Sequence, residues 1–301
     1  MEFGRVEKGA EMIDHTLPPD GRTVDLVLPG KPVTDCNFYV GCAKWGRKEW
    51  VGLFYPEKTK ERDFLFEYAK RLDTIELGAT FYGLPDQSFI ERFANQVALA
   101  ENENFLFLPK MFREITHIRR LRDCRELLDQ YLDNLVPLGK HLGPHLVQLG
   151  DAFGPKQFDD LKKFVEVLPS GHQYFFELRH PNWFSDEIDR GRVFNLFREH
   201  GVGTVMADTS GRRDCLHMEM GTPDLYVRFN GNGKDYRAND LVRINAWAER
   251  IAAWKAKGLR NVYFIIHQSD EVDTPMLASL AINTFNEKLA ANVRPIDWSI
   301  R

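Results

Sequence analysis

Residues 174–181 read YFFELRHP, a short apolar run that ends in charged side chains. The run at 174–178 is too short for a buried helix. Its two apolar faces are typical of a strand that is enclosed on both sides in a parallel sheet. Seven similar runs lie at 38–42, 74–77, 105–108, 145–149, 204–207, 225–229 and 262–266. We therefore predict eight strands.

Helix-like segments separate most of these runs. One of them has apolar residues at helical spacing from Leu241 to Trp254, with Asp240 as the predicted N-cap. Only the link at residues 209–223 lacks a clear helical pattern. Eight strands that alternate with helices match an α/β fold, the (β/α)8 TIM barrel. An open, doubly wound sheet is the alternative, but the turn from Gly41 to Gly46 has no dinucleotide-binding glycine pattern.

Residues 1–36 are predicted to be an N-terminal extension. They contain two turn signals, Pro18-Pro19-Asp20-Gly21 and Pro29-Gly30, and residues 24–28 fit a short strand. We expect the extension to pack outside the barrel or to be partly disordered. Residues 37–301 are predicted to form a single TIM-barrel domain.

The composition argues against several classes of protein. The chain has 301 residues and a formal net charge of −4, which disfavours non-specific binding to nucleic acid or to anionic membranes. It contains no apolar run long enough for a membrane-spanning helix. The N-terminus is too charged for a secretory signal, and the four cysteines are scattered, so we expect a cytoplasmic protein. Oligomeric state is left open.

Polar residues gather at one end of the predicted strands. They are Glu76, Lys110, Gln148, Glu177, Arg179, Asp208, Arg228, Asn230 and His267, with Tyr82, His117, His180 and Trp183 close behind. Catalytic residues of TIM barrels lie at the C-terminal ends of the strands, and isolated charge inside a barrel is costly. This asymmetry indicates a functional site. The alternative is a self-neutralising ion network that only fills the barrel mouth.

The predicted roles follow from side-chain chemistry. Glu177, Asp208, His117 and Lys110 are the catalytic candidates, with a carboxylate as general base and His117 or Lys110 as acid. The predicted substrate-binding residues are Glu76, Tyr82, Gln148, Arg179, His180, Trp183, Arg228, Asn230 and His267. Glu177 and Arg179 share one strand face, so Arg179 should lower the pKa of Glu177 and make it an anchor. Proton transfer would then fall to Asp208, Lys110 or His117.

No cofactor is predicted, and no residue is assigned as a metal ligand. A divalent metal is the alternative, because Glu76, Glu177, Asp208, His180 and His267 include suitable ligand types. The sequence has no His-x-His, His-Glu-x-x-His or cysteine cluster, and neighbouring cations would compete for the same carboxylates.

These motifs together resemble the YecE-like family, which is domain of unknown function 72. The resemblance covers about residues 38–290, and it is carried by Thr80-Phe81-Tyr82, Lys110, Thr116-His117, Gln148-Leu149, the run from Glu177 to Trp183, Asp208 and Arg228-Phe229-Asn230-Gly231. It implies a TIM-barrel fold and leaves the reaction open. The family's Arg-x-His-Gly and closing Asn-Asn are replaced here by Arg228-Phe229-Asn230-Gly231 and His267-Gln268. We therefore expect altered substrate detail.

Three functions compete. The favoured one is an enzyme, a hydrolase, lyase or isomerase, that acts on a small anionic substrate bearing phosphate or carboxylate. The second is a metal-dependent nucleic-acid-processing barrel, by analogy with barrel endonucleases, in which a basic stretch would meet phosphates. That stretch comprises Arg113, Arg119, Arg120, Arg122 and Arg125. The third is a non-catalytic ligand-binding barrel that uses the same pocket.

Overall fold

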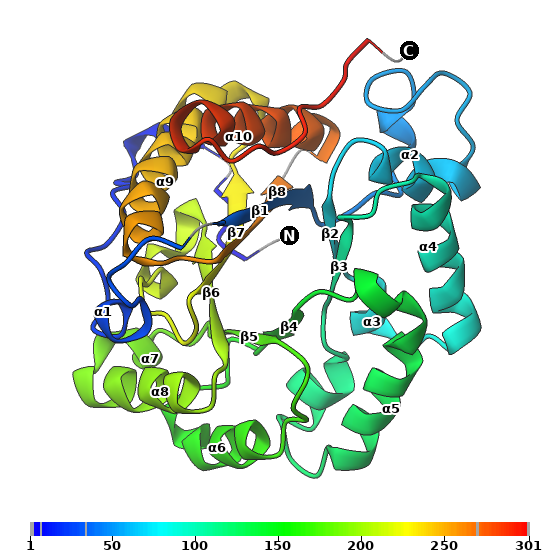
Figure 1. The fold of residues 1–301 in the computed structure, drawn as a ribbon. Helices are drawn as coiled ribbons and strands as arrows, with labels where there is room; N and C mark the ends of the chain where they lie inside the picture. The colour runs from blue at the N-terminus through cyan, green and yellow to red at the C-terminus, as the bar shows by residue number, and fades with distance from the viewer. Residues whose placement is uncertain (1–2, 7, 34, 269–270, 300–301) are drawn as a thin grey trace.

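The computed structural model describes residues 3–6, 8–33, 35–268 and 271–299. Its centre is a parallel sheet of β1 (Asn37–Cys42), β2 (Thr74–Leu77), β3 (Leu106–Pro109), β4 (His145–Gln148), β5 (Tyr174–Glu177), β6 (Gly203–Asp208), β7 (Asp224–Gly231) and β8 (Asn261–Gln268). The strands are hydrogen-bonded in the order β3-β2-β1-β8-β7-β6-β5-β4. The two ends of this order meet through single bridges, Phe107 with Leu142 and Lys110 with Leu146. The predicted TIM-barrel fold is confirmed as a nearly closed barrel (Figure 1).

Helices surround the barrel (Figure 1). They are α1 (Val24–Val27), α2 (Phe64–Ala69), α3 (Ala79–Tyr82), α4 (Gln87–Leu99), α5 (Arg125–Leu135), α6 (Phe158–Glu166), α7 (Asn182–Ser185), α8 (Glu187–Glu199), α9 (Arg237–Lys257) and α10 (Thr274–Leu289). Between β6 and β7 the chain forms only a short 3-10 helix, Ser210–Cys215, as the weak pattern there predicts. Helix α9 begins three residues before Asp240, so Asp240 lies in its first turn and is not the N-cap.

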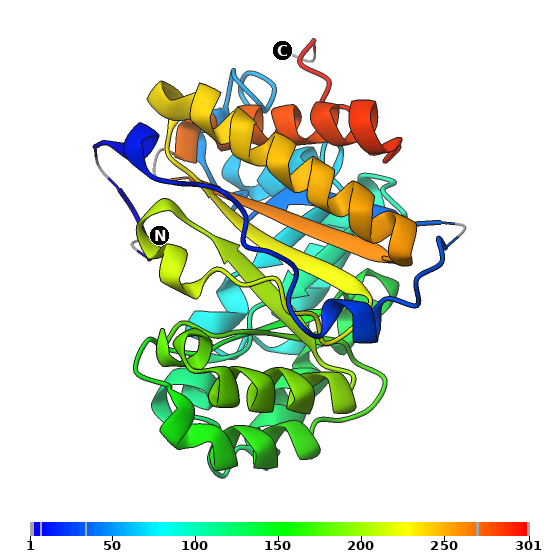
Figure 2. The same cartoon turned by 90° about the vertical axis from the view of Figure 1, so that its left-hand side faces the viewer.

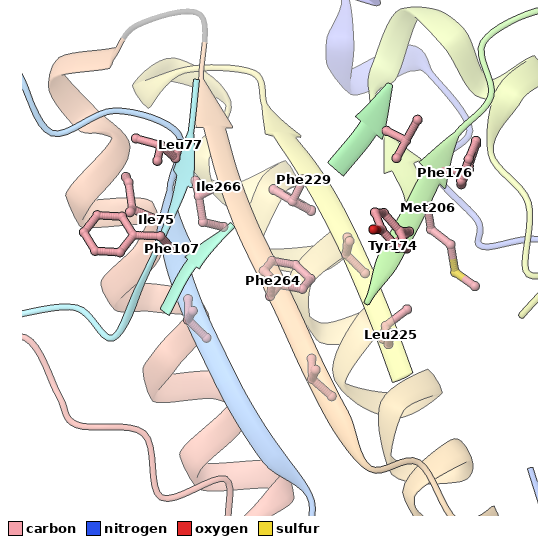
Figure 3. Packing of buried hydrophobic residues seen from close by; sticks show 14 of the residues in the cluster. Ile75, Leu77, Phe107, Tyr174, Phe176, Met206, Leu225, Phe229, Phe264 and Ile266 are labelled. Atoms are coloured by element: carbon pink, nitrogen blue, oxygen red, sulfur yellow. The ribbon is translucent and has the colours of Figure 1, made fainter. Parts of the chain in front are cut away.

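The apolar side chains form an inner and an outer core. The inner one lies within the barrel and consists of Leu108, Leu146, Phe175, Val205, Tyr226, Tyr263 and Ile265. The outer one lies between strands and helices, where Phe229, Phe264 and Ile266 pack from neighbouring strands (Figure 3). Alternate residues of each strand therefore face opposite cores. The same alternation decides which polar residues enter the barrel.

Most of the N-terminal extension runs beside α9, on the outside of the barrel (Figure 2). The N–H of Gly21 donates to the carbonyl of Met218 at 3.0 Å. The Glu219 carboxylate accepts from the N–H of Thr23 at 3.0 Å and from its hydroxyl at 2.8 Å. This part of the extension thus covers the segment after β6, where the crossover α-helix is missing.

The short strand at residues 24–28 is not formed. These residues begin helix α1, and Leu28 closes it by donating its N–H to the carbonyl of Val24. Val24 is buried in the outer core, which gives the segment an apolar anchor without any strand partner. A strand needs a sheet edge to pair with, and the hydrogen bonds of the extension go to the loop after β6 instead.

Candidate functional site

The centre of the barrel mouth is the Arg228 guanidinium, which is held by two carboxylates. Its Nε and Nη2 donate to Glu76 Oε2 at 2.8 Å and Oε1 at 3.0 Å, and its Nη1 donates to Glu177 Oε2 at 2.6 Å. Nη2 also donates to Nε2 of His267 at 3.1 Å. All three charged side chains are buried. The two carboxylates come from β2 and β5 and meet on a cation from β7.

Arg179 extends this cluster toward the surface. Its Nε donates to Glu177 Oε1 at 2.6 Å, and its Nη2 donates to Gln148 Oε1 at 2.8 Å. Gln148 Oε1 also accepts from Arg228 Nη1 at 3.3 Å, so one amide oxygen joins the two guanidinium groups. Gln148 and Glu177 are direct partners across the β4–β5 pair, which places both at the same level of the barrel. We call Glu76, Gln148, Glu177, Arg179, Arg228 and His267 the mouth cluster.

The charges of the mouth cluster fix the protonation states of its carboxylates. Burial alone would raise the pKa of Glu177, but Arg179 and Arg228 outweigh burial and lower it to about 2. Burial opposes ionisation of Glu76 in the same way, and Arg228 together with His267 brings its pKa below the ordinary value. Both glutamates therefore stay ionised at neutral pH. They act as anchors for Arg228 and not as proton donors.

Lys110 stands beside the mouth cluster in a different situation. Its Nζ lies 3.9 Å from the centre of the Phe81 ring. Burial and the nearby Arg228 lower the pKa of Lys110 to about 8, even though Glu76 and Glu177 favour its charged form. Within the described residues, no carboxylate lies within salt-bridge distance of this ammonium group, and no hydrogen-bond acceptor is found for it. Lys110 is therefore a group that titrates close to neutral pH.

His117 also contacts Phe81. The two rings meet edge to face with centroids 5.1 Å apart, and Nδ1 is 2.8 Å from the hydroxyl of Thr116. Burial, followed by the charges of Lys110 and Arg179, lowers the pKa of His117 to about 4. The imidazole is thus neutral at physiological pH. It sits in a π-helical turn, Glu114–Ile118, a local distortion that is frequent at functional sites.

Asp208 does not join the mouth cluster, which corrects the expected convergence of the strand-end residues. Its Oδ1 accepts from Arg243 at 2.8 Å and from Arg213 at 2.5 Å, and its Oδ2 accepts from Nε1 of Trp247 at 2.7 Å. Arg243 and Trp247 belong to α9, so the carboxylate lies between the barrel and that helix. The reason is strand alternation, since Val205 of the same strand faces the inner core and Asp208 is three residues further on.

Other predicted site residues lie at the rim or outside it. The Trp183 ring is buried, and its Nε1 donates to the carbonyl of Phe153 at 2.7 Å, so it anchors a loop. His180 accepts the N–H of Asn182 at 3.2 Å within its own turn. Tyr82 is 75% exposed next to Phe81. Asn230 lines a small cavity at the mouth.

Two polar residues after β6 also belong to the mouth and are absent from the predicted set. Thr209 is buried, and its hydroxyl donates to the carbonyl of Gly4 at 2.9 Å. Arg212 Nη2 donates to the carbonyl of Arg179 at 2.8 Å. The same strand-end rule that selected Asp208 extends to both, because Thr209 follows it directly and Arg212 lies in the same loop. Phe3 has no such signal, and its ring lies over the guanidinium of Arg179 at 4.0 Å.

The described residues contain no group of three or more His, Cys, Asp or Glu side chains arranged to hold a metal ion. The basic stretch before α5 is largely paired, since Arg119, Arg122 and Arg125 make ion pairs with Glu114, Asp160 and Asp129. Likewise, no helix in the described ranges is long and apolar enough to cross a membrane.

The chain is similar to known proteins in both sequence and fold. Residues 39–298 match the family described as protein of unknown function DUF72. The chain belongs to the DUF72 family. The UPF0759 protein YecE of Escherichia coli strain K12 is 25% identical over 257 residues, which are 79% of this chain and 89% of that protein. The predicted membership of the YecE-like family is therefore confirmed.

Solved DUF72 structures share the fold. A DUF72 family protein from Enterococcus faecalis V583 superposes with a TM-score of 0.66 at 18% identity, covering 84% of this chain and 99% of that one. One from Thermotoga maritima MSB8 gives a TM-score of 0.65 at 21% identity, covering 83% and 99%. The barrel is thus the DUF72 barrel, and about 38 residues before the family match form additional chain in this protein.

Proposed function

We propose that the protein is an enzyme that binds a small anionic substrate at the C-terminal face of the barrel and transfers a proton through Lys110. The observation that carries this proposal is the half-buried Lys110 ammonium, which faces two paired carboxylates without being paired itself among the described residues. A cation in that position attracts an anion. Because its pKa is about 8, both protonation states are accessible near neutral pH, as acid/base catalysis requires.

The other mouth residues support this role. Arg228 donates its N–H groups to Glu76, Glu177, Gln148 and His267, so it fixes the two carboxylates in place beside Lys110. A neutral His117 in contact with the same Phe81 ring offers a second proton-transfer group. Asp208 has no part in this proposal, because its carboxylate faces α9.

Turnover of a panel of phosphate monoesters and small carboxylic acids by the full chain tests the proposal. We expect Lys110→Met to lower kcat/KM by about 100-fold or more, the usual contribution of a general acid or base. The activity of the wild-type protein should depend on a group with a pKa of about 8. Lys70→Met is the matched control. Lys70 also lies over a phenylalanine ring, with its Nζ 5.1 Å from the ring centre, but it is the exposed residue that caps the C-terminus of α2.

The outcomes separate the competing functions. Loss of activity in Lys110→Met with normal activity in Lys70→Met supports the proposal. Tight binding of an anion by the wild-type protein with no turnover of any panel member would replace the enzyme with a ligand-binding barrel. Equal activity in both variants would remove Lys110 from the chemistry.

A further inference from the structure

Residues 3–6 of the N-terminal extension lie across the barrel mouth. The Phe3 ring stands over two guanidinium groups, at 4.0 Å from Arg179 and 4.8 Å from Arg212. The carbonyl of Gly4 accepts hydrogen bonds from the Thr209 hydroxyl and from the N–H of Gly211, both at 2.9 Å. These contacts join the first residues of the chain to the segment after β6, about 200 positions away.

The segment leaves little space on the side of the mouth near His267. Together with Asn230, Gly231, His267 and other residues, residues 3–6 enclose a cavity of about 20 Å³. A cavity of that size holds roughly one water molecule. A phosphate- or carboxylate-bearing ligand therefore does not fit into this part of the mouth while residues 3–6 lie over it.

The described part of the segment, residues 3–6, is not buried in a core. Arg5 is exposed, and Phe3, Gly4 and Val6 are only partly buried. Gly4 has a left-handed backbone with φ of 69°, and a Cβ atom there would lie 2.3 Å from the Thr209 hydroxyl oxygen. The close approach to Thr209 thus requires glycine at this position. Segments with few buried apolar contacts open at low free-energy cost, so this one is suited to displacement.

We propose that residues 3–6 are a built-in competitor that occupies a ligand subsite formed by Arg179, Thr209, Gly211 and Arg212. The ligand that displaces them carries a planar aromatic ring next to an anionic oxygen group, as in an aryl phosphate or aryl carboxylate. Its ring takes the place of the Phe3 ring over the two guanidinium groups, which attract the face of a π-system. Its oxygens take the place of the Gly4 carbonyl as hydrogen-bond acceptors.

This inference rests on the proposed function, in that it names the substrate class of the same site. The movement of the segment can nevertheless be tested without any ligand. Lys110 lies beside the closed mouth, so its acetylation by trace acetic anhydride, followed by peptide mass spectrometry, reports opening. We expect labelling of Lys110, relative to Lys70, to rise about tenfold in Phe3→Ala, the factor that a desolvated cation–π contact contributes.

Two further variants sharpen the labelling test. Gly4→Ala should open the mouth by a separate cause, because its Cβ collides with Thr209. Met12→Ala is the matched control, since Met12 belongs to the same extension but is 82% exposed. Equal Lys110 labelling in the wild-type protein, Phe3→Ala and Gly4→Ala would refute the proposal that residues 3–6 act as a competitor. This conclusion would hold whatever reaction the protein catalyses.

The ligand class is tested by calorimetric titration with phenyl phosphate and with inorganic phosphate. Phe3→Ala should bind phenyl phosphate about tenfold more tightly than the wild-type protein, because the competitor has been removed. Adding Arg212→Met to Phe3→Ala should abolish the preference for phenyl phosphate over inorganic phosphate. Equal affinity for the two probes in Phe3→Ala would refute the aromatic subsite. Increased labelling of Lys110 without binding of either probe would instead refute the proposed function and the ligand class together.

Discussion

Replacing Arg228 with methionine removes a cation that contacts both glutamates of the mouth cluster. Methionine keeps the length of the side chain but donates no hydrogen bonds to Glu76 Oε1, Glu76 Oε2 or Glu177 Oε2. Glu177 retains Arg179 at 2.6 Å. Glu76 loses its main partner while it stays 3% exposed. The variant therefore contains one buried carboxylate without an adequate counter-charge.

The expected loss is large at neutral pH. Breaking a buried ion pair by removing one partner costs about 3–5 kcal/mol in the free energy of unfolding. In the wild-type protein the glutamate pKa values are depressed, so their contribution to stability is complete above the ordinary glutamate pKa and is lost as the pH falls toward 2. In the variant, burial raises the pKa of Glu76, so that protonation at low pH relieves the penalty. The difference between the two proteins should thus shrink by about 2 kcal/mol or more between pH 7 and pH 4.

Urea denaturation of both proteins at pH 7 and pH 4 measures this difference. The double variant Glu76→Gln/Arg228→Met should recover part of the loss, because the uncompensated charge is gone. Arg243→Met is the matched control for function, since Arg243 is equally buried and binds Asp208 and Asp240 outside the mouth. It should lose comparable stability but retain activity. A loss below about 1 kcal/mol for Arg228→Met, or one that is equal at the two pH values, would contradict the charge states assigned here.

Three further predictions concern residues outside the mouth cluster. Asp208→Asn should lower the free energy of unfolding by about 3 kcal/mol, because Arg213 and Arg243 lose their shared carboxylate, while kcat/KM measured on the substrate panel stays unchanged. Gly41→Ala should cost about 3 kcal/mol in urea denaturation, since its Cβ would lie 2.0 Å from the carbonyl oxygen of Thr74, whereas Gly78→Ala, which meets no atom within 4 Å, should be close to neutral. Burial lowers the pKa of His145 to about 3, so the folded protein keeps it neutral while the unfolded chain takes up a proton below pH 6.5. The free energy of unfolding should therefore fall by about 1.4 kcal/mol per pH unit below pH 6.5 because of His145. His145→Asn should reduce this pH dependence, as measured by urea denaturation at pH 7 and pH 5.

The strands could be predicted from the sequence because each one is a short apolar run enclosed on both faces. The predicted run at 74–77 coincides with β2. Strands β7 and β8 extend beyond the predicted runs at 225–229 and 262–266, to Gly231 and Gln268. Their last residues are polar because they leave the core at the mouth, where an apolar pattern no longer marks a strand. The path of the extension was not accessible. Its contacts with Thr209 and Glu219 join residues that lie about 200 positions apart in the sequence. A local sequence pattern cannot predict such contacts.

The two faces of a strand were harder to distinguish than the strand itself. Glu177 and Asp208 both end apolar runs, yet Glu177 enters the barrel and Asp208 faces α9. In an amphipathic strand, the polar positions show which face is exposed. Here both faces are apolar, so the composition does not show which face a residue occupies. The face follows only from the number of residues that separate it from a neighbour known to point into the barrel. Tyr226 and Arg228 on β7 illustrate that count, since both face the interior and lie two residues apart.

The inner and outer arginine–carboxylate networks of the described residues differ in their balance of charge. In the outer network, the carboxylates of Asp208 and Asp240 meet the guanidinium groups of Arg213 and Arg243, so the charges balance. In the inner network, Glu76 and Glu177 face Arg179 and Arg228, with Lys110 close by as a further cation. Burial and the arginine charges keep the pKa of that lysine near 8. The outer network is balanced without a ligand, and the additional cation of the inner network supports the proposal that an anionic substrate supplies its counter-charge.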